Sequence, residues 1–372
     1  MSPESEKTTE MFKTLVELFQ RFIYFEDSAL YILSAIYVLL TYLYDVFDEI
    51  PYLHIHGLKG SGKSRLADLF EGVCFNSFNS SEISEAALYR EIESRHGDTT
   101  MIIDEADDLG RSSRRKALLS ILRSGYRRNG NVTRCRSNGN IVRFATFCPK
   151  IIINEKGIQD SALESRTIPI HMIKSPDFLK TFRFSKLQKE FKEIKELINL
   201  FAGGYRDMAS DYYNEQIEKI QGRDEELWAP IFIITLILHE AGCSFISGSK
   251  LKDNITTLAE KITQQRRETQ LIGNLDAQIL DATLAYMEEE KPLAHSDGLY
   301  VGEQLCKFIK ESLSIPGLKL DTVSRILKRH NVITAAERRR LNVSGKTLQR
   351  TCYQFDKEKL SKLTDEFAFN EK

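Results

Sequence analysis

Short apolar runs rich in β-branched residues recur in the first half of the chain and are typical of strands in a parallel sheet. One runs from Thr99 to Ile103 and another from Lys150 to Ile153, and neither alternates with polar residues. Strands covered by helices on both faces show this continuous pattern. A third strand-like run, Tyr52 to His56, precedes a helix-forming segment at 65–70. The pattern predicts an α/β fold with a parallel sheet and helices on both of its faces.

Residues 28–44 form an uncharged apolar stretch that admits two interpretations. The stretch is a little short for a membrane span, and acidic residues such as Glu26 and Asp45 flank it instead of Lys or Arg. A helix buried against the sheet is therefore favoured over a membrane span. The polar, acidic start of the chain, Met1 to Glu10, does not match a signal peptide.

The pattern changes after residue 178, where helical spacing prevails up to residue 287. The composition turns polar around 289–297, and a new unit is expected to begin there. Its pattern predicts helices over 301–313 and 320–330, a basic strand pair within 338–353 and a closing helix over 357–367. Helices followed by a basic ribbon suggest a winged-helix domain. Such domains bind DNA or dock proteins, and the fold alone does not decide between the two.

The segment that follows the first strand, Gly57-Leu58-Lys59-Gly60-Ser61-Gly62-Lys63-Ser64, has the G-x-x-x-x-G-K-S pattern of a phosphate-binding loop, or Walker A motif. Its glycines let successive backbone N–H groups point at phosphates, and the following helix adds its positive N-terminal end. A chance glycine-rich turn is the alternative, but the flanking strand and helix favour the loop. The residues expected to bind nucleotide are Gly57, Gly60, Ser61, Gly62, Lys63, Ser64 and Arg65.

Two carboxylates follow the strand-like run that ends at residue 103. They supply the metal ligand and the catalytic base that a phosphate loop lacks. Asp104 is expected to hold Mg²⁺ together with the hydroxyl of Ser64, and Glu105 is expected to orient the attacking water. Asn154 ends the next apolar run, and its amide could hydrogen-bond that water or the γ-phosphate. The sequence therefore predicts an ATPase that uses ATP and Mg²⁺, with Lys63 reaching the β- and γ-phosphates.

The order of these motifs, followed by Ser165-Arg166, resembles that of AAA+ ATPases. The resemblance implies that Asn154 is the first sensor, and that Arg166 is an arginine finger acting on nucleotide bound by the neighbouring subunit of a ring-like homo-oligomer such as a hexamer. By analogy with the AAA+ lid, Arg223 is implied as the second sensor. The alternatives are a surface or salt-bridged arginine for Arg166 and a helix-terminal arginine near Trp228 for Arg223.

Four further segments resemble an uncharacterised family of helicase-like ATPases from phages, plasmids and bacterial mobile elements, often linked to primase modules. The resemblance extends from about Tyr31 to about Ala241. Together with the change in composition at 289–297, this resemblance predicts the domain order 1–50, an N-terminal helical segment; 51–175, the AAA+ core; 176–290, a helical lid with connecting helices; and 291–372, the winged-helix-like domain. The segments that carry it are 84–90, 122–128, 147–150 and 223–230.

Positive charge is concentrated between Leu109 and Asn154, which hold eleven Lys or Arg and no Asp or Glu, although the whole chain has a net charge of −1. Two alternating runs about Ser137-Asn138-Gly139-Asn140 predict a hairpin that resembles the pore hairpin of replicative AAA+ helicases. Uncompensated arginines indicate an anion: nucleic acid is favoured over the nucleotide or acidic neighbours in a ring. The expected contacts are Arg134, Arg136 and Arg143, with Arg127 and Arg128 as further candidates.

Three functions remain open at this point. A helicase-like motor would translocate on or remodel DNA, a nucleotide switch or assembly scaffold would act in mobile-element maintenance or defence without processive unwinding, and a protein remodeller would grip acidic clients. The remodeller is disfavoured, because segment 77–84 offers only Phe78 as a peptide-gripping aromatic. The six scattered cysteines contain no C-x-x-C pair, which predicts no zinc site or disulfide framework and a cytoplasmic location.

Overall fold

The protein divides into two compact units, unit 1 (Met1–Ile262) and unit 2 (Thr263–Lys372). The boundary falls within one helix, α9 (Gly248–Gly273). The computed structural model describes residues 3–80, 90–92, 94–95, 97–104, 106, 113–135, 141–155, 157–158, 160–176, 179–217, 220, 222–273, 275–289, 298–343 and 346–369.

A five-stranded parallel sheet in the order β2-β3-β6-β1-β7 forms the centre of unit 1, as the apolar runs predict. Residues 101–103 and 150–154 are buried along their whole length, which explains why these runs do not alternate. Because β6 lies between β3 and β1, the carboxyl ends of these three strands are neighbours at one edge of the sheet. The strands are β1 (Tyr52–His56), β2 (Phe78–Ser80), β3 (Met101–Ile103), β6 (Lys150–Asn154) and β7 (Thr167–His171).

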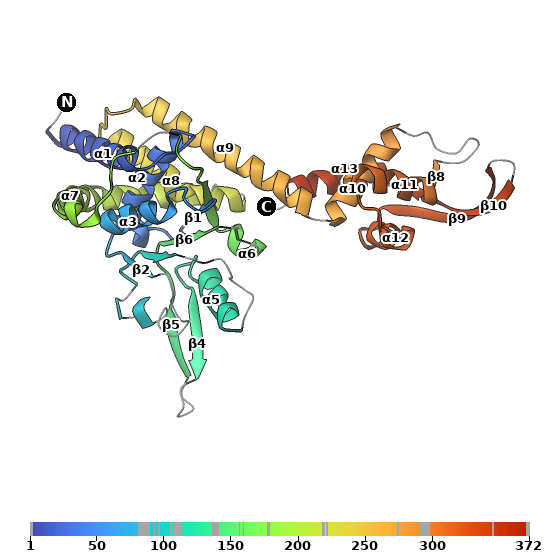
Figure 1. The fold of residues 1–372 in the computed structure, drawn as a ribbon, viewed down its shortest axis with the longest axis horizontal. Helices are drawn as coiled ribbons and strands as arrows, with labels where there is room; N and C mark the ends of the chain where they lie inside the picture. Colours follow the sequence, from blue (N-terminus) through green and yellow to red (C-terminus); the bar gives the residue numbers. More distant parts are fainter. Residues whose placement is uncertain are drawn as a thin grey trace. The chain divides into compact units, whose positions relative to one another are not determined.

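Helices from both ends of unit 1 pack together around this sheet (Figure 1). α1 contacts α2, α3 and α7, and α2 also contacts α7 and α8. Buried apolar residues recur along α1 at three- and four-residue spacing, from Met11 to Phe22. The helices, with the short 3-10 turn η1, are α1 (Pro3–Phe22), α2 (Ala29–Leu43), η1 (Tyr44–Val46), α3 (Lys63–Val73), α5 (Ser113–Ser124), α6 (Ser161–Glu164), α7 (Phe184–Ile217), α8 (Arg223–Glu240) and α9.

α2 lies inside the core of unit 1, as expected for a helix buried against the sheet. The segment Ala29–Val46 is long and apolar enough to cross a membrane, but most of its side chains are buried against other parts of the unit. Its Tyr37 hydroxyl donates to the carbonyl oxygens of Lys150 at 2.9 Å and Pro51 at 3.2 Å. These bonds attach α2 directly to the strands.

A hairpin of β4 (Asn131–Cys135) and β5 (Ile141–Ala145) projects from the rest of unit 1 next to α5 (Figure 1). Its base is held by Lys150, a fully buried lysine. The ammonium group donates to the carbonyl oxygens of Thr146 at 2.7 Å, Cys148 at 3.0 Å and Gly125 at 3.3 Å, and lies 4.9 Å from the centre of the Tyr52 ring. Burial lowers the pKa of Lys150. This contact joins the hairpin to the sheet.

Unit 2 begins earlier than the composition predicted. α10 was expected to belong to the helical lid, but Ile279, Leu280 and Tyr286 share a hydrophobic core with α11, α12 and α13. A three-stranded antiparallel sheet in the order β8-β10-β9 completes the unit. Its elements are α10 (Leu275–Glu289), β8 (Leu299–Val301), α11 (Gly302–Ser312), α12 (Leu320–Arg329), β9 (Ile333–Val343), β10 (Lys346–Phe355) and α13 (Lys357–Phe369).

Candidate nucleotide-binding site

The phosphate-binding loop joins β1 to α3, and its shape requires glycine at specific positions. Gly57 has φ +150°, and a Cβ there would lie 2.1 Å from the carbonyl oxygen of Met172, just after β7. Gly60 and Gly62 have φ +84° and +98°, in the left-handed region that other residues avoid. Gly62 also caps the start of α3. The local geometry of the predicted loop is therefore present.

Lys63 is the first residue of α3, and its side chain turns back over the loop. Its ammonium group donates to the carbonyl oxygens of Gly57 at 2.6 Å and Leu58 at 3.1 Å. The Ser61 hydroxyl is buried and has no hydrogen-bond partner among the described residues. A lysine folded onto the loop, an unused buried hydroxyl and the N-terminal end of α3 together fit a polyphosphate.

Asp104 follows β3 directly and is half-buried at the same edge of the sheet. Asp68 on α3 lies close enough to Asp104 to feel its charge. Burial is the main cause that raises the pKa of Asp68, and the charges of Glu71 and Asp104 add to it. Ser64, in the first turn of α3, is exposed. A hydroxyl and one carboxylate suit Mg²⁺, which usually takes its remaining ligands from phosphates and water. Glu105, the expected water-orienting base, lies outside the described residues.

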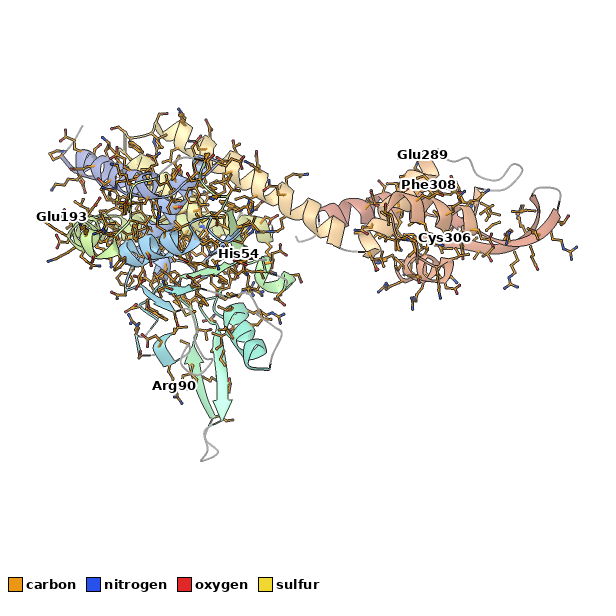
Figure 2. The ribbon with its side chains drawn as sticks, viewed as in Figure 1. His54, Arg90, Glu193, Glu289, Cys306 and Phe308 are labelled. Carbon is orange, nitrogen blue, oxygen red and sulfur yellow. The ribbon has the colours of Figure 1, made fainter. Side chains whose placement is uncertain are left out.

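Asn154 ends β6 between the phosphate loop and Asp104, and its side chain is almost fully buried. Its Oδ1 accepts from the Gly157 amide at 3.0 Å, and its Nδ2 donates to the Gly157 carbonyl at 3.1 Å. The His54 Nε2 lies 3.0 Å from the same Oδ1. His54 is packed in the interior of unit 1 (Figure 2). The amide is thus held from two sides.

A stack of three histidines extends from this bond toward the loop. The rings of His54 and His56 lie 4.9 Å apart with planes 17° from parallel, and the rings of His56 and His171 lie 5.0 Å apart. Burial lowers the pKa of His54 to about 4, and burial together with the neighbouring histidines and Lys63 lowers the pKa of His56 to about 4. The stack was not predicted, although two histidines two residues apart on a strand share one face.

Arg166 lies at the opposite end of the sheet from the loop. Its carbonyl accepts from the Tyr52 amide at 3.0 Å, at the start of β1, whereas the loop follows the end of that strand. Five strand residues separate the two edges by about 13 Å. The guanidinium group donates to the Ala162 carbonyl and lies 6.0 Å from the Tyr126 ring centre. Arg166 is therefore not brought to the phosphate loop of its own chain.

Arg223 lies near Arg166 instead of near the loop. Burial and then Arg223 lower the pKa of Arg166, and Arg223 also acts on the pKa of Tyr126. The structure thus places Arg223 at the amino end of the sheet, where it does not serve the phosphate loop of its own chain as a second sensor. Arg65, also expected at the nucleotide, donates to the Phe22 carbonyl at 3.2 Å and so attaches α3 to α1.

Arg127 and Arg128 form contacts within unit 1 and do not belong to the hairpin. Arg127 pairs with Glu49 at 2.5 Å across an isolated β-bridge. Arg128 pairs with Asp48 at 2.9 Å, donates to two backbone carbonyls near η1 and lies 5.6 Å from the centre of the Phe147 ring. Carboxylates some eighty residues earlier in the chain already hold both arginines, and their role in nucleic-acid contact stays a prediction.

The described part of the hairpin contains two of the other expected arginines, Arg134 and Arg143. Arg143 is exposed and pairs in register with Thr133, and Arg134 pairs with Val142. Val132 and Phe144 are buried, which holds one face of the hairpin against the protein. Arg136 and the side chain of Arg134 lie outside the described part of the chain.

No protein-family model and no curated protein matches this chain. Solved structures with distant similarity include an active helicase, SCCmec type IV Cch (15% identity, 96% of this chain and 71% of that chain, TM-score 0.41). Another is the C-terminal region of NrS-1 (15% identity, 94% of this chain and 75% of that chain, TM-score 0.39). A third is the Aeropyrum pernix ORC1 protein in complex with DNA (12% identity, 89% of this chain and 90% of that chain, TM-score 0.24). These similarities are too distant to assign a function.

Proposed function

We propose that this protein is an oligomeric, Mg²⁺-dependent ATPase of the AAA+ type that binds and translocates on or remodels nucleic acid. One observation supports this most directly. The phosphate loop and Asp104 lie at the carboxyl edge of the sheet, whereas Arg166 and Arg223 lie at its amino edge. A ring in which one copy's amino edge meets the next copy's carboxyl edge would complete each site with arginines from a neighbour.

The residues of one chain would divide the work at each site. The loop amides and Lys63 would hold the β- and γ-phosphates, and Lys63 would exchange its bonds to the Gly57 and Leu58 carbonyls for phosphate oxygens. Ser64 and Asp104 would hold Mg²⁺, which neutralises charge on the phosphates when bound. Asn154 would position the attacking water, and Glu105 would polarise it.

Arg166 of a neighbouring copy would stabilise the charge that develops on the transferred phosphoryl group. An arginine supplied in this way increases the rate by about 10³ to 10⁵. Hydrolysis would then depend on assembly, because each copy holds its own arginine at the far edge of the sheet.

The β4–β5 hairpin supports the proposal that ATP hydrolysis drives movement along nucleic acid. It projects from unit 1 and carries the exposed Arg143, and Arg134 lies on the paired strand. Arginines of this kind neutralise phosphates without reading sequence. We place unit 2 among the winged-helix-like folds, on the basis of two helices followed by a β-ribbon.

A nucleotide switch or assembly scaffold is the second candidate, and one observation favours it. Arg127 and Arg128 are paired with carboxylates within the unit, so fewer of the expected arginines remain for nucleic acid. Glu105→Gln separates the two candidates. A motor variant of this kind should bind ATP and DNA yet lose strand displacement, whereas a scaffold should keep its assembled state and its output.

The proposed function is tested by the ATPase rate of the purified protein with and without single-stranded and duplex DNA, measured together with native mass. Stimulation by DNA and a specific activity that rises with protein concentration are expected. A rate that depends on neither would contradict the proposal.

A further inference from the structure

The ribbon of β9 and β10 in unit 2 extends well beyond the third strand of its sheet. β8 pairs only with Cys352–Gln354, whereas β9 and β10 continue in register out to Val343 and Lys346. The outer half of the ribbon is therefore a two-stranded hairpin. Such a hairpin has little intrinsic stability in water, and Leu341 attaches it to the unit by packing against Leu299, Val301 and Cys352.

One face of this outer ribbon carries arginines without acidic neighbours. Arg338 and Arg340 are both exposed, and the register places them opposite Thr351 and Gln349. Residues two apart on a strand share a face and lie about 7 Å apart. Among the described residues, no ion pair is formed by either arginine, so two like charges lie side by side without compensation.

On the opposite face of the ribbon, the arginines are paired with carboxylates. Arg339 pairs with Glu337 at 3.1 Å, and Arg350 pairs with Glu303 of α11 at 2.5 Å. Leu341 and Leu348 lie opposite each other on this same face. The contrast between the two faces indicates that the uncompensated one is kept for an external anion, because repulsion between two arginines lowers stability.

The end of α12 is a weaker candidate for the same role. Its Arg329 pairs with Asp276 of α10 at 3.0 Å, and the His330 Nε2 lies 2.9 Å from the same carboxylate. Arg325 and Lys328 are exposed, but Asp321 lies one helical turn before Arg325. The charge of Arg329 is thus balanced within unit 2, and Asp321 offsets part of the charge of Arg325.

We propose that the face formed by Arg338, Arg340, Gln349 and Thr351 binds the phosphate backbone of nucleic acid. Two guanidinium groups, an amide and a hydroxyl are donors suited to phosphate and sugar oxygens, which position a protein on nucleic acid without reading its sequence. This site is separate from the hairpin of unit 1 and does not depend on ATP hydrolysis or on the proposed function of that hairpin.

The full-length variant Arg338→Ala with Arg340→Ala tests the site through binding of a short labelled DNA duplex and its single strand across a salt series. Log affinity falls with log salt, and each lost phosphate contact makes this slope less steep by about 0.9 for a duplex. The slope of the double variant should therefore be less steep by about 1.8. We expect at least a roughly tenfold weaker affinity at low salt. Arg338→Lys with Arg340→Lys should retain most of the slope.

Two further double variants serve as comparisons for the ribbon variant. Lys189→Ala with Lys192→Ala removes the same charge from exposed positions on α7 and should leave the slope unchanged. Arg325→Ala with Lys328→Ala tests α12. An unchanged slope in the ribbon variant, an equal loss in the α7 variant, or a loss confined to the α12 variant would each overturn the proposal. An unchanged melting temperature and ATPase rate in the ribbon variant would show that folding is intact.

Discussion

The imidazole of His54 lies 3.0 Å from the amide oxygen of Asn154, so a residue inside β1 holds the side chain that ends β6. Oδ1 of Asn154 also accepts from the Gly157 amide, and the two bonds fix the orientation of the amide. Asn154 lies between the phosphate loop and Asp104, where the proposed reaction takes place. His54 is therefore a positioning residue for Asn154.

His54→Ala should reduce the ATPase kcat about tenfold while leaving the KM for ATP within about twofold, because a misdirected amide affects the reaction more than binding. His54→Gln offers an N–H donor in place of the imidazole and should recover much of the rate. Steady-state kinetics of both variants check this. Equal losses in kcat and KM, with no rescue by Gln, would mean that His54 only supports packing.

Acidification should destabilise unit 1 through His54. Burial lowers its pKa to about 4 in the folded state, from an ordinary value of 6.5. Between these values the unfolded chain takes up a proton and the folded chain does not, so stability falls as the pH drops from 6.5 toward 4. The loss from His54 should reach about 2 kcal/mol at pH 5.

Urea unfolding at pH 7 and pH 5 measures this loss, with His54→Gln as the control that cannot titrate at that position. The wild type should lose more stability than the variant between the two pH values. An equal pH dependence in both proteins would show that His54 does not carry the effect.

Lys63→Ala should abolish nucleotide binding, since the ammonium group above the loop would no longer meet the β- and γ-phosphates. Lys59→Ala is a matched control, because Lys59 is an exposed residue of the same loop. Binding of a fluorescent ATP analogue should fall by about 100-fold or more in the first variant and change little in the second. Similar binding by both variants would contradict the assignment of the loop.

Lys150→Met should destabilise unit 1 by about 3 kcal/mol or more, because the buried carbonyls of Gly125, Thr146 and Cys148 would lose their shared donor. Lys189→Met, at a position with a 90% exposed side chain, should change little. Thermal or urea unfolding checks both. A loss of less than about 1 kcal/mol in Lys150→Met would show that water replaces the ammonium group.

The parts of this fold that the sequence predicted depend on local signals. β1, the phosphate loop and α3 follow from an apolar run, glycines and a helix start within about twenty residues, and β6 follows from its unbroken apolar pattern. β2 has only three residues, all half-buried, and shows no comparable pattern. α10 was assigned to the preceding domain because its amphipathic sequence does not say which core it joins.

The surroundings of Arg128 and Arg223 depend on contacts between distant parts of the chain. Arg128 is held by Asp48, 80 positions earlier, and nothing in the local basic run reveals that partner. Arg223 begins α8, and its proximity to Arg166, 57 positions earlier, is set by the tertiary fold. Composition can count such charges, but it cannot decide which of them remain available for a ligand.

The central claim is that each active site is shared between copies, and mixing two inactive variants tests it most directly. Lys63→Ala lacks the phosphate contact but keeps Arg166, and Arg166→Ala has the opposite defect. Each variant alone should be almost inactive, and an equimolar mixture should regain ATPase activity, because some junctions would combine an intact loop with an intact arginine. If the mixture stays as inactive as its components while both still assemble with each other, the shared site is wrong.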